Sequence, residues 1–88
     1  MEANEVLQFE AVVLPHLDAA YTLARYLTRD PHNAEDLVQE ACLRALRYFE
    51  GFRGGDGRNW FLTIVRNTCY SWRKRRQGEA LADEFDEE

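Results

Sequence analysis

The stretch Asn33-Ala34-Glu35-Asp36-Leu37-Val38-Gln39-Glu40-Ala41 has the pattern of the start of an amphipathic helix. Asn33 is a favourable N-cap, and Asp36 three residues later approximates a capping box. Apolar residues recur every three or four positions, which predicts one buried face, and Gly51 is placed to end the helix. The predicted buried residues are Ala34, Leu37, Val38, Ala41, Cys42, Ala45, Tyr48 and Phe49.

Helical periodicity extends on both sides of this segment. An apolar series at helical spacing precedes it and passes through Pro15, where we expect a kink or two abutting helices near Leu14. That series is Val6, Phe9, Val13, Leu17, Ala20, Ala24 and Leu27. A last helix is predicted from about Arg58 to Arg76, with Trp60, Phe61, Ile64, Val65, Thr68 and Trp72 buried. With no alternation typical of strands, the sequence predicts an all-α fold, a compact bundle of three to four helices.

Length and composition favour one small intracellular domain. The chain has 88 residues, and its two cysteines are too few for a disulfide framework, so buried free thiols in a reducing cytosol are expected. No apolar run is long enough to span a bilayer, and the acidic N-terminus does not resemble a signal peptide. We therefore expect a cytoplasmic protein without membrane insertion.

The net charge of −5 hides three blocks of different sign. Residues 1–50 carry a net charge of −5, residues 51–77 carry +6, and residues 78–88 carry −6. The basic middle block favours nucleic acid as a partner. The acidic end is interpreted as a disordered tail or the start of an inter-domain linker, which leaves residues 1–77 as the helical domain.

The outer face of the helix that begins near Asn33 is a candidate protein-binding surface. It combines charged residues with Leu43, and Leu46 also lies off the buried series. A solvated helix surface would explain the charges equally well, but a leucine ringed by charges can anchor an interface. The candidate residues are Asp36, Gln39, Glu40, Leu43, Arg44 and Arg47.

The glycine-rich loop of residues 51–57 and the helix after it form a candidate nucleic-acid site. Glycines let a backbone approach a ligand closely, and aromatic and polar groups suit an unstacked base. Basic residues on the helix can neutralise phosphates. An ordinary connection and a solvated basic helix end remain the simpler alternatives. The candidates are Phe52, Arg53, Gly54, Gly55, Asp56, Asn59, Thr63, Arg66, Asn67, Tyr70, Arg73 and Lys74, with Arg75 and Arg76 as further phosphate contacts.

The sequence offers no arrangement typical of an enzyme. His16 and His32 are isolated from other metal ligands, Ser71 has no context of a nucleophile, and the glycine loop lacks the Lys-Ser/Thr of a P-loop. We expect no catalytic residues, no metal and no cofactor.

Three motifs together resemble region 2 of the extracytoplasmic-function (ECF) sigma factors of bacterial RNA polymerase. They are Ala34-Glu35-Asp36-Leu37-Val38-Gln39-Glu40, the loop entry Phe52-Arg53-Gly54, and Trp60…Ile64…Arg66-Asn67, within a match of roughly residues 9–76. The resemblance implies that the segment from Asp36 to Glu40 docks on the clamp helices of the polymerase β′ subunit. It also implies that the loop and last helix recognise and melt the promoter −10 element and capture a flipped base of the single-stranded non-template strand, with Asn67 on the DNA-facing side.

The resemblance also implies a second domain, region 4, which reads the −35 element and is not in this sequence. We therefore expect an isolated domain, either a part of a longer protein or a naturally short one. Two other functions stay open: a generic helical DNA-binding module, and a protein-interaction domain held by an anti-sigma factor.

Overall fold

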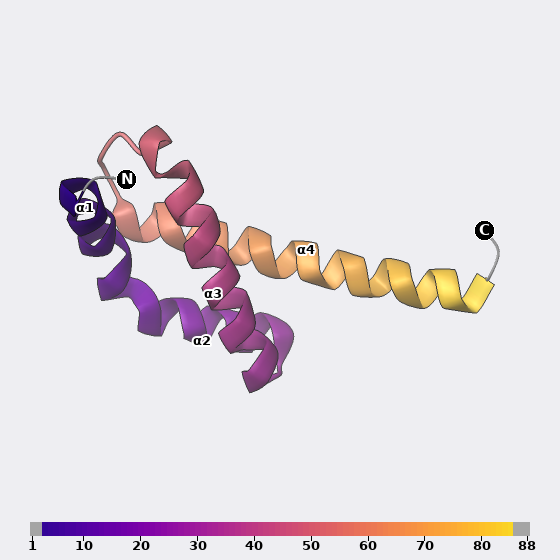
Figure 1. Cartoon of the computed structure of the whole chain (residues 1–88). Coiled ribbons are helices and arrows are strands. Elements are labelled where there is room, and N and C mark those ends of the chain that lie inside the picture. Colours follow the sequence, from indigo (N-terminus) through magenta and orange to yellow (C-terminus); the bar gives the residue numbers. More distant parts are fainter. Residues whose placement is uncertain (1–2, 86–88) are drawn as a thin grey trace.

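Four α-helices and two short 3-10 turns make up the described part of the chain. The computed structural model describes the backbone of residues 3–85 and the side chains of residues 3–78. The elements are α1 (Ala3–Val13), η1 (Leu14–His16), α2 (Leu17–Thr28), α3 (Pro31–Tyr48), η2 (Phe49–Gly51) and α4 (Gly57–Phe85). Within these residues there is no strand, so the predicted all-α class is confirmed. Helices α2, α3 and α4 pack into a three-helix bundle, and α1 lies against α4 (Figure 1).

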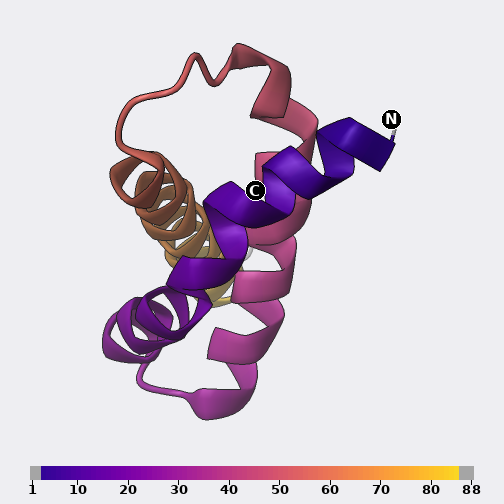
Figure 2. The same ribbon diagram turned by 90° about the vertical axis from the view of Figure 1, so that its left-hand side faces the viewer.

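The predicted break at Pro15 is confirmed. The 3-10 turn Leu14–His16 separates α1 from α2, with Pro15 near its start. Proline has no N–H to donate and clashes with the preceding helical turn, so one continuous helix is excluded. The two helices abut instead and change direction at this turn (Figure 2).

The start of α3 differs from the prediction. Asp30, not Asn33, is the N-cap: its Oδ1 accepts hydrogen bonds from the backbone N–H groups of His32 at 2.9 Å and Asn33 at 3.3 Å. Pro31 occupies the first helical position, where its missing N–H costs nothing and its fixed φ suits the helix. Asn33 lies inside the helix, and its side-chain amide donates to Asp30 Oδ2 at 3.0 Å.

Small side chains let the three bundle helices approach closely. The core contains five fully buried alanines: Ala20, Ala24, Ala34, Ala41 and Ala45. They surround the larger buried residues Phe61 and Val65 of α4. The buried hydroxyl of Thr68 donates to the Ile64 carbonyl at 2.7 Å, so it leaves no unsatisfied polar group in the core.

The predicted apolar series are largely confirmed, with two corrections at their ends. Tyr48 is 56% exposed, because α3 ends at this residue and nothing covers the ring. Val6 is 37% exposed, since the first turns of α1 lie beyond the three-helix core.

Helix α4 is longer than predicted. It continues past Arg76 to Phe85 and projects away from the bundle as a single helix (Figure 1). The described part of the predicted acidic tail therefore has helical backbone, and residues 86–88 lie outside the described residues. The division into a domain of residues 1–77 and a tail or linker of residues 78–88 stays a prediction.

Candidate functional site

A cluster of four aromatic rings fixes the loop between η2 and α4. Phe52, in the loop, stacks with Phe49 at a centroid distance of 6.0 Å and contacts Trp60 at 4.8 Å. Phe49 also meets Phe9 of α1 edge-on at 5.5 Å. This aromatic cluster (Phe9, Phe49, Phe52, Trp60) joins α1, η2, the loop and α4. Phe52 therefore has one side committed to the fold, which holds the base of the loop in place.

Three glycines of the loop are required by its structure for different reasons. Gly54 and Gly55 have φ angles of 90° and 86°, a region that other residues enter only with strain. Gly57 lies against α1, where an added Cβ would come within 2.9 Å of Val12 Cγ1. The sequence Gly54-Gly55-Asp56-Gly57 thus makes a tight bend that brings the loop close to α1.

Asp56 is the N-cap of α4. Its Oδ1 accepts a hydrogen bond from the Asn59 N–H at 2.9 Å, and its carbonyl accepts one from the Trp60 N–H at 3.0 Å. This role was not predicted, because Asp56 was considered only as a nucleic-acid contact. The cap fixes where α4 begins and hence where Asn59 projects.

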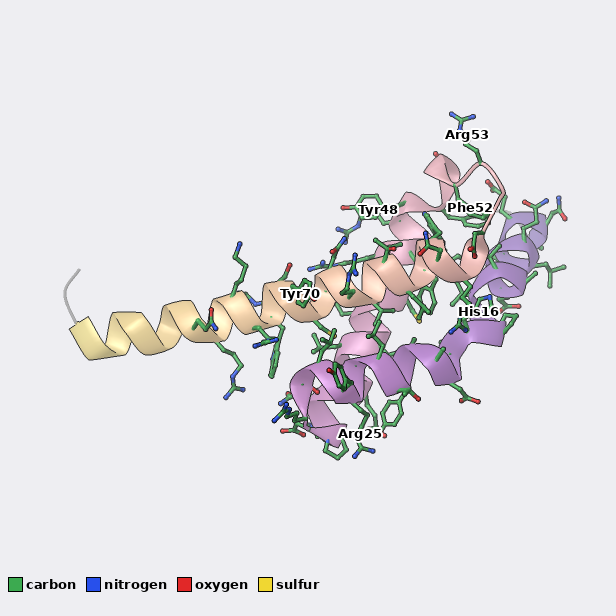
Figure 3. The ribbon with its side chains drawn as sticks, turned by 180° about the vertical axis from the view of Figure 1, so that it is seen from behind. His16, Arg25, Tyr48, Phe52, Arg53 and Tyr70 are labelled. Carbon is green, nitrogen blue, oxygen red and sulfur yellow. The ribbon has the colours of Figure 1, made fainter. Side chains whose placement is uncertain are left out.

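An open groove of about 530 Å³ lies between the loop and α4, and we call it the loop groove. The loop itself is at the end of the bundle opposite the α2–α3 turn (Figure 2). The structure brings six of the predicted nucleic-acid candidates together here: Phe52, Arg53, Gly54, Asp56, Asn59 and Thr63. Figure 3 shows the Arg53 side chain extending from the loop beyond the rest of the molecule.

Three residues that line the loop groove are not among the predicted candidates: Gly51, Trp60 and Ile64. Trp60 and Ile64 were interpreted as core residues, yet both are half-buried and line the loop groove. Trp60 has one side in the aromatic cluster and so presents another to the groove. Their place at the edge of the apolar series of α4, next to Asn59 and Thr63, was the available signal.

The remaining nucleic-acid candidates lie outside the loop groove. Arg66, Asn67, Tyr70, Arg73 and Lys74 are exposed on α4, and Gly55 is exposed in the loop. Figure 3 shows Tyr70 on the face of α4 turned away from α3. Asn67 does not line the loop groove, and its place on the DNA-facing side of α4 stays a prediction.

The outer face of α3 carries all six predicted protein-binding residues. Asp36, Gln39 and Arg47 are exposed, and Leu43 is 64% exposed. Glu40 and Arg44 are half-buried and form an ion pair at 2.8 Å, which fixes both side chains across one helical turn. Asp36 is partnered only by His32, at 3.7 Å, among the described residues. An exposed leucine surrounded by charges is thus confirmed, while its role in binding stays a prediction.

The α3 face and the α4 face point to different sides of the molecule. Helix α3 lies in front of α4 in Figure 1 and behind it in Figure 3. A protein on α3 would therefore leave the loop groove and the basic face of α4 accessible.

The side chains that could bind a metal do not cluster among the described residues. Within residues 3–78 no group of three or more His, Cys, Asp or Glu side chains is placed to hold a metal ion. Both cysteines are free thiols, Cys69 buried and Cys42 half-buried. Burial raises the pKa of the Cys69 thiol above its ordinary 9.0, and the nearby Glu40 charge adds to the rise; burial alone raises the pKa of Cys42. Neither thiol is activated as a nucleophile.

None of the described helices is long and apolar enough to cross a membrane.

Comparison with known proteins agrees with this arrangement. Residues 12–79 match the Sigma-70 region 2 family. The chain is 32% identical over 81 residues to the ECF RNA polymerase sigma factor SigE of Mycolicibacterium smegmatis, a match that covers 89% of this chain and 32% of the relative. It is 33% identical over 85 residues to the RNA polymerase sigma-E factor of Streptomyces avermitilis, covering 96% of this chain and 48% of the relative.

A shorter match has a higher identity. Over 56 residues this chain is 46% identical to the ECF RNA polymerase sigma factor SigG of Mycobacterium tuberculosis, a match that covers 62% of this chain and 15% of the relative. This chain thus spans less than half the length of each of these three relatives. No solved structure matches the chain. The family match covers most of the chain, so the chain belongs to the Sigma-70 region 2 family, within the ECF group of RNA polymerase sigma factors, which are transcription initiation factors and not enzymes.

Proposed function

We propose that this domain binds core RNA polymerase through the outer face of α3 and recognises and melts the promoter −10 element through the loop groove and α4. The observation that carries the proposal is the loop groove itself. It gathers an aromatic wall, a tightly bent glycine backbone and polar side chains at the start of a basic helix.

The polymerase-binding part rests on the α3 face. Leu43 is large, apolar and exposed, and the Glu40–Arg44 ion pair beside it is already ordered. Ordered side chains lose little entropy on binding, and an apolar anchor within a charged rim is typical of an interface. The proposed partner surface is the pair of clamp helices of the β′ subunit.

The DNA-binding part rests on the chemistry of the loop groove. A base that leaves the duplex loses its stacking, and an aromatic surface such as Phe52 and Trp60 offers a replacement. Asn59 and Thr63 can donate to and accept from a base edge, while Arg53 is free to reach a phosphate. The proposed ligand is a flipped base of the single-stranded non-template strand.

The exposed face of α4 continues this surface. Arg66, Arg73 and Lys74 supply positive charge for the backbone, and Asn67 and Tyr70 lie among them. An anti-sigma factor that covers either surface would block the function, and it is a further proposed partner.

The test is selection of promoter sequences from a random DNA library by the complex of this domain with bacterial core polymerase. The wild type should enrich a short motif. Arg53→Gln should weaken enrichment by about tenfold while polymerase binding is unchanged. The matched control is Arg25→Gln, because Arg25 lies on the side of α2 away from α4 and stacks on Tyr21 at 5.8 Å (Figure 3). No enriched motif, or equal losses in both variants, would contradict the proposal.

A further inference from the structure

A second groove runs between α2 and α4 and adjoins the surface of α4 that the proposed function uses. Two hollows of about 460 Å³ and 170 Å³ share the apolar side chains Leu23 and Leu62. The larger of them meets a third hollow, of about 450 Å³, at Tyr26. We call the three hollows together the α2–α4 groove.

The charges along the α2–α4 groove are all positive. Arg58, Arg66 and Arg73 line it from α4, and Arg29 lines it from the end of α2. None of the described residues that line the three hollows is acidic. Asp30, next to Arg29, is occupied as the N-cap of α3, and Asp18, next to Ala19, is exposed and does not line the hollows. Residues 1–77 together carry a net charge of only +1, so these arginines are a local excess of positive charge that attracts an anion.

Two aromatic side chains mark the far end of the groove. Tyr26 is 75% exposed, the most exposed large apolar side chain among the described residues. Trp72 lines the same hollow from α4, and the Arg76 guanidinium lies 5.0 Å from its ring centroid. The exposed ring of Tyr26 and the half-buried ring of Trp72 lie beside arginines, so bases can stack on the rings while the arginines neutralise the phosphates.

A duplex fits this surface less well than a single strand. Bases in a duplex are stacked on one another, so they cannot reach Tyr26, Trp72 or the apolar floor formed by Leu23 and Leu62. A single strand can place its bases on the rings and its phosphates against the arginines. From Arg58 to Arg73 the groove follows α4 for about 22 Å at 1.5 Å per residue.

We propose that the α2–α4 groove is a second binding site for single-stranded nucleic acid, with Tyr26 and Trp72 as its stacking surface and Arg29 and Arg73 as its phosphate contacts. This second site is additional to the loop groove of the proposed function, and single-stranded nucleic acid should bind to it without core polymerase. Asn59 and Thr63 line both grooves, so a strand that leaves the loop groove can enter the α2–α4 groove without leaving the protein surface.

The two tryptophans of the chain allow the two grooves to be observed separately. Trp60 lies at the loop groove and Trp72 at the α2–α4 groove. In Trp60→Phe, an aromatic ring is kept in the cluster and Trp72 is the only remaining reporter. This variant is titrated with oligothymidylate and, separately, oligouridylate of about eight nucleotides, and Trp72 fluorescence is recorded.

Saturable quenching of Trp72 is expected, and the tighter oligonucleotide identifies DNA or RNA as the preferred strand. In the same background, Tyr26→Ala should weaken binding by about fivefold or more, and Arg29→Glu by about tenfold. Arg25→Glu is the matched control, with the same change of charge on the same helix outside the groove, and should change affinity by about twofold at most.

Two results would overturn the site. One is the absence of Trp72 quenching by either oligonucleotide in protein that far-UV circular dichroism shows to be folded. The other is wild-type affinity in Tyr26→Ala together with equal affinity for a duplex, which would leave only a patch of positive charge. Core polymerase binding, measured on the same variants, should stay at the wild-type level. Its loss would instead point to a failure of the proposed function.

Discussion

Replacing the N-cap of α4 tests how the loop is held at the start of the helix. Asp56 Oδ1 accepts the Asn59 N–H at 2.9 Å, and the first turn of α4 contains no acidic residue. Asp56→Ala removes both the hydrogen bond and the only acidic charge at this helix end. The lost cap costs about 1 kcal/mol of unfolding free energy. The lost interaction with the helix dipole costs about 0.3–1 kcal/mol more.

Asp56→Asn separates these two contributions. Asparagine keeps a side-chain oxygen for the Asn59 N–H and removes only the charge, so it should lose no more than the dipole contribution. In a domain of this size about 1 kcal/mol lowers the midpoint of thermal unfolding by about 4–8 °C. We therefore expect Asp56→Ala to unfold about 5–15 °C below the wild type and Asp56→Asn a few degrees below it.

The measurement is thermal unfolding followed by circular dichroism at low and high salt. The loss in Asp56→Asn should shrink as salt screens the charge, while most of the loss in Asp56→Ala should persist. The reasoning is refuted if the alanine variant unfolds with the wild type, or if asparagine is as damaging as alanine at high salt.

Three further predictions concern the burial of Phe61 and Leu43, the positive φ angle of Gly55 and the thiol of Cys69. Phe61→Ala should lose about 3–5 kcal/mol in urea unfolding because the ring is fully buried, whereas Leu43→Ala should change stability by less than about 0.5 kcal/mol. Gly55→Ala should lose about 1 kcal/mol at its φ of 86°, and no loss would argue against this bend. Because burial and Glu40 raise the pKa of Cys69, folding favours the protonated thiol. The stability that this thiol contributes should therefore be present below pH 9.0 and fall as the pH rises through the higher folded-state pKa. Cys69→Ala should remove that part of the pH dependence of unfolding. The same dependence of stability on pH in wild type and Cys69→Ala would contradict the role of this thiol.

Helical periodicity predicted most of the core because contacts between helices recur with the helical repeat. The series that includes Ala34, Ala41 and Ala45 was found correctly for this reason. Periodicity failed where a residue sits at the edge of a series or beyond the bundle. Trp60 is at such an edge and faces both the core and a groove, and Tyr48 falls where α3 has already ended.

The helix ends were harder to predict because several residues competed for one role. Asp30 and Asn33 are both good N-caps, and Pro31 between them decided in favour of Asp30. The continuation of α4 past Arg76 has no matching signal, since a change from basic to acidic charge does not itself end a helix.

No local sequence pattern could have predicted the α2–α4 groove. Tyr26 and Trp72 belong to helices far apart in the sequence, and only the packing of α2 on α4 brings them to one hollow. The loop groove was predictable because its residues are contiguous, from the glycine loop into the first turns of α4.

Binding to core RNA polymerase tests the central claim most directly. The fluorescently labelled domain is titrated with purified bacterial core polymerase, and anisotropy is compared among wild type, Asp36→Arg and Glu35→Arg. Glu35 is an exposed acid on α3 outside the proposed contact set, so its variant controls for the change of charge. The account predicts saturable binding that Asp36→Arg abolishes and Glu35→Arg retains. Absence of binding by folded wild type, or equal binding by all three proteins, would contradict it.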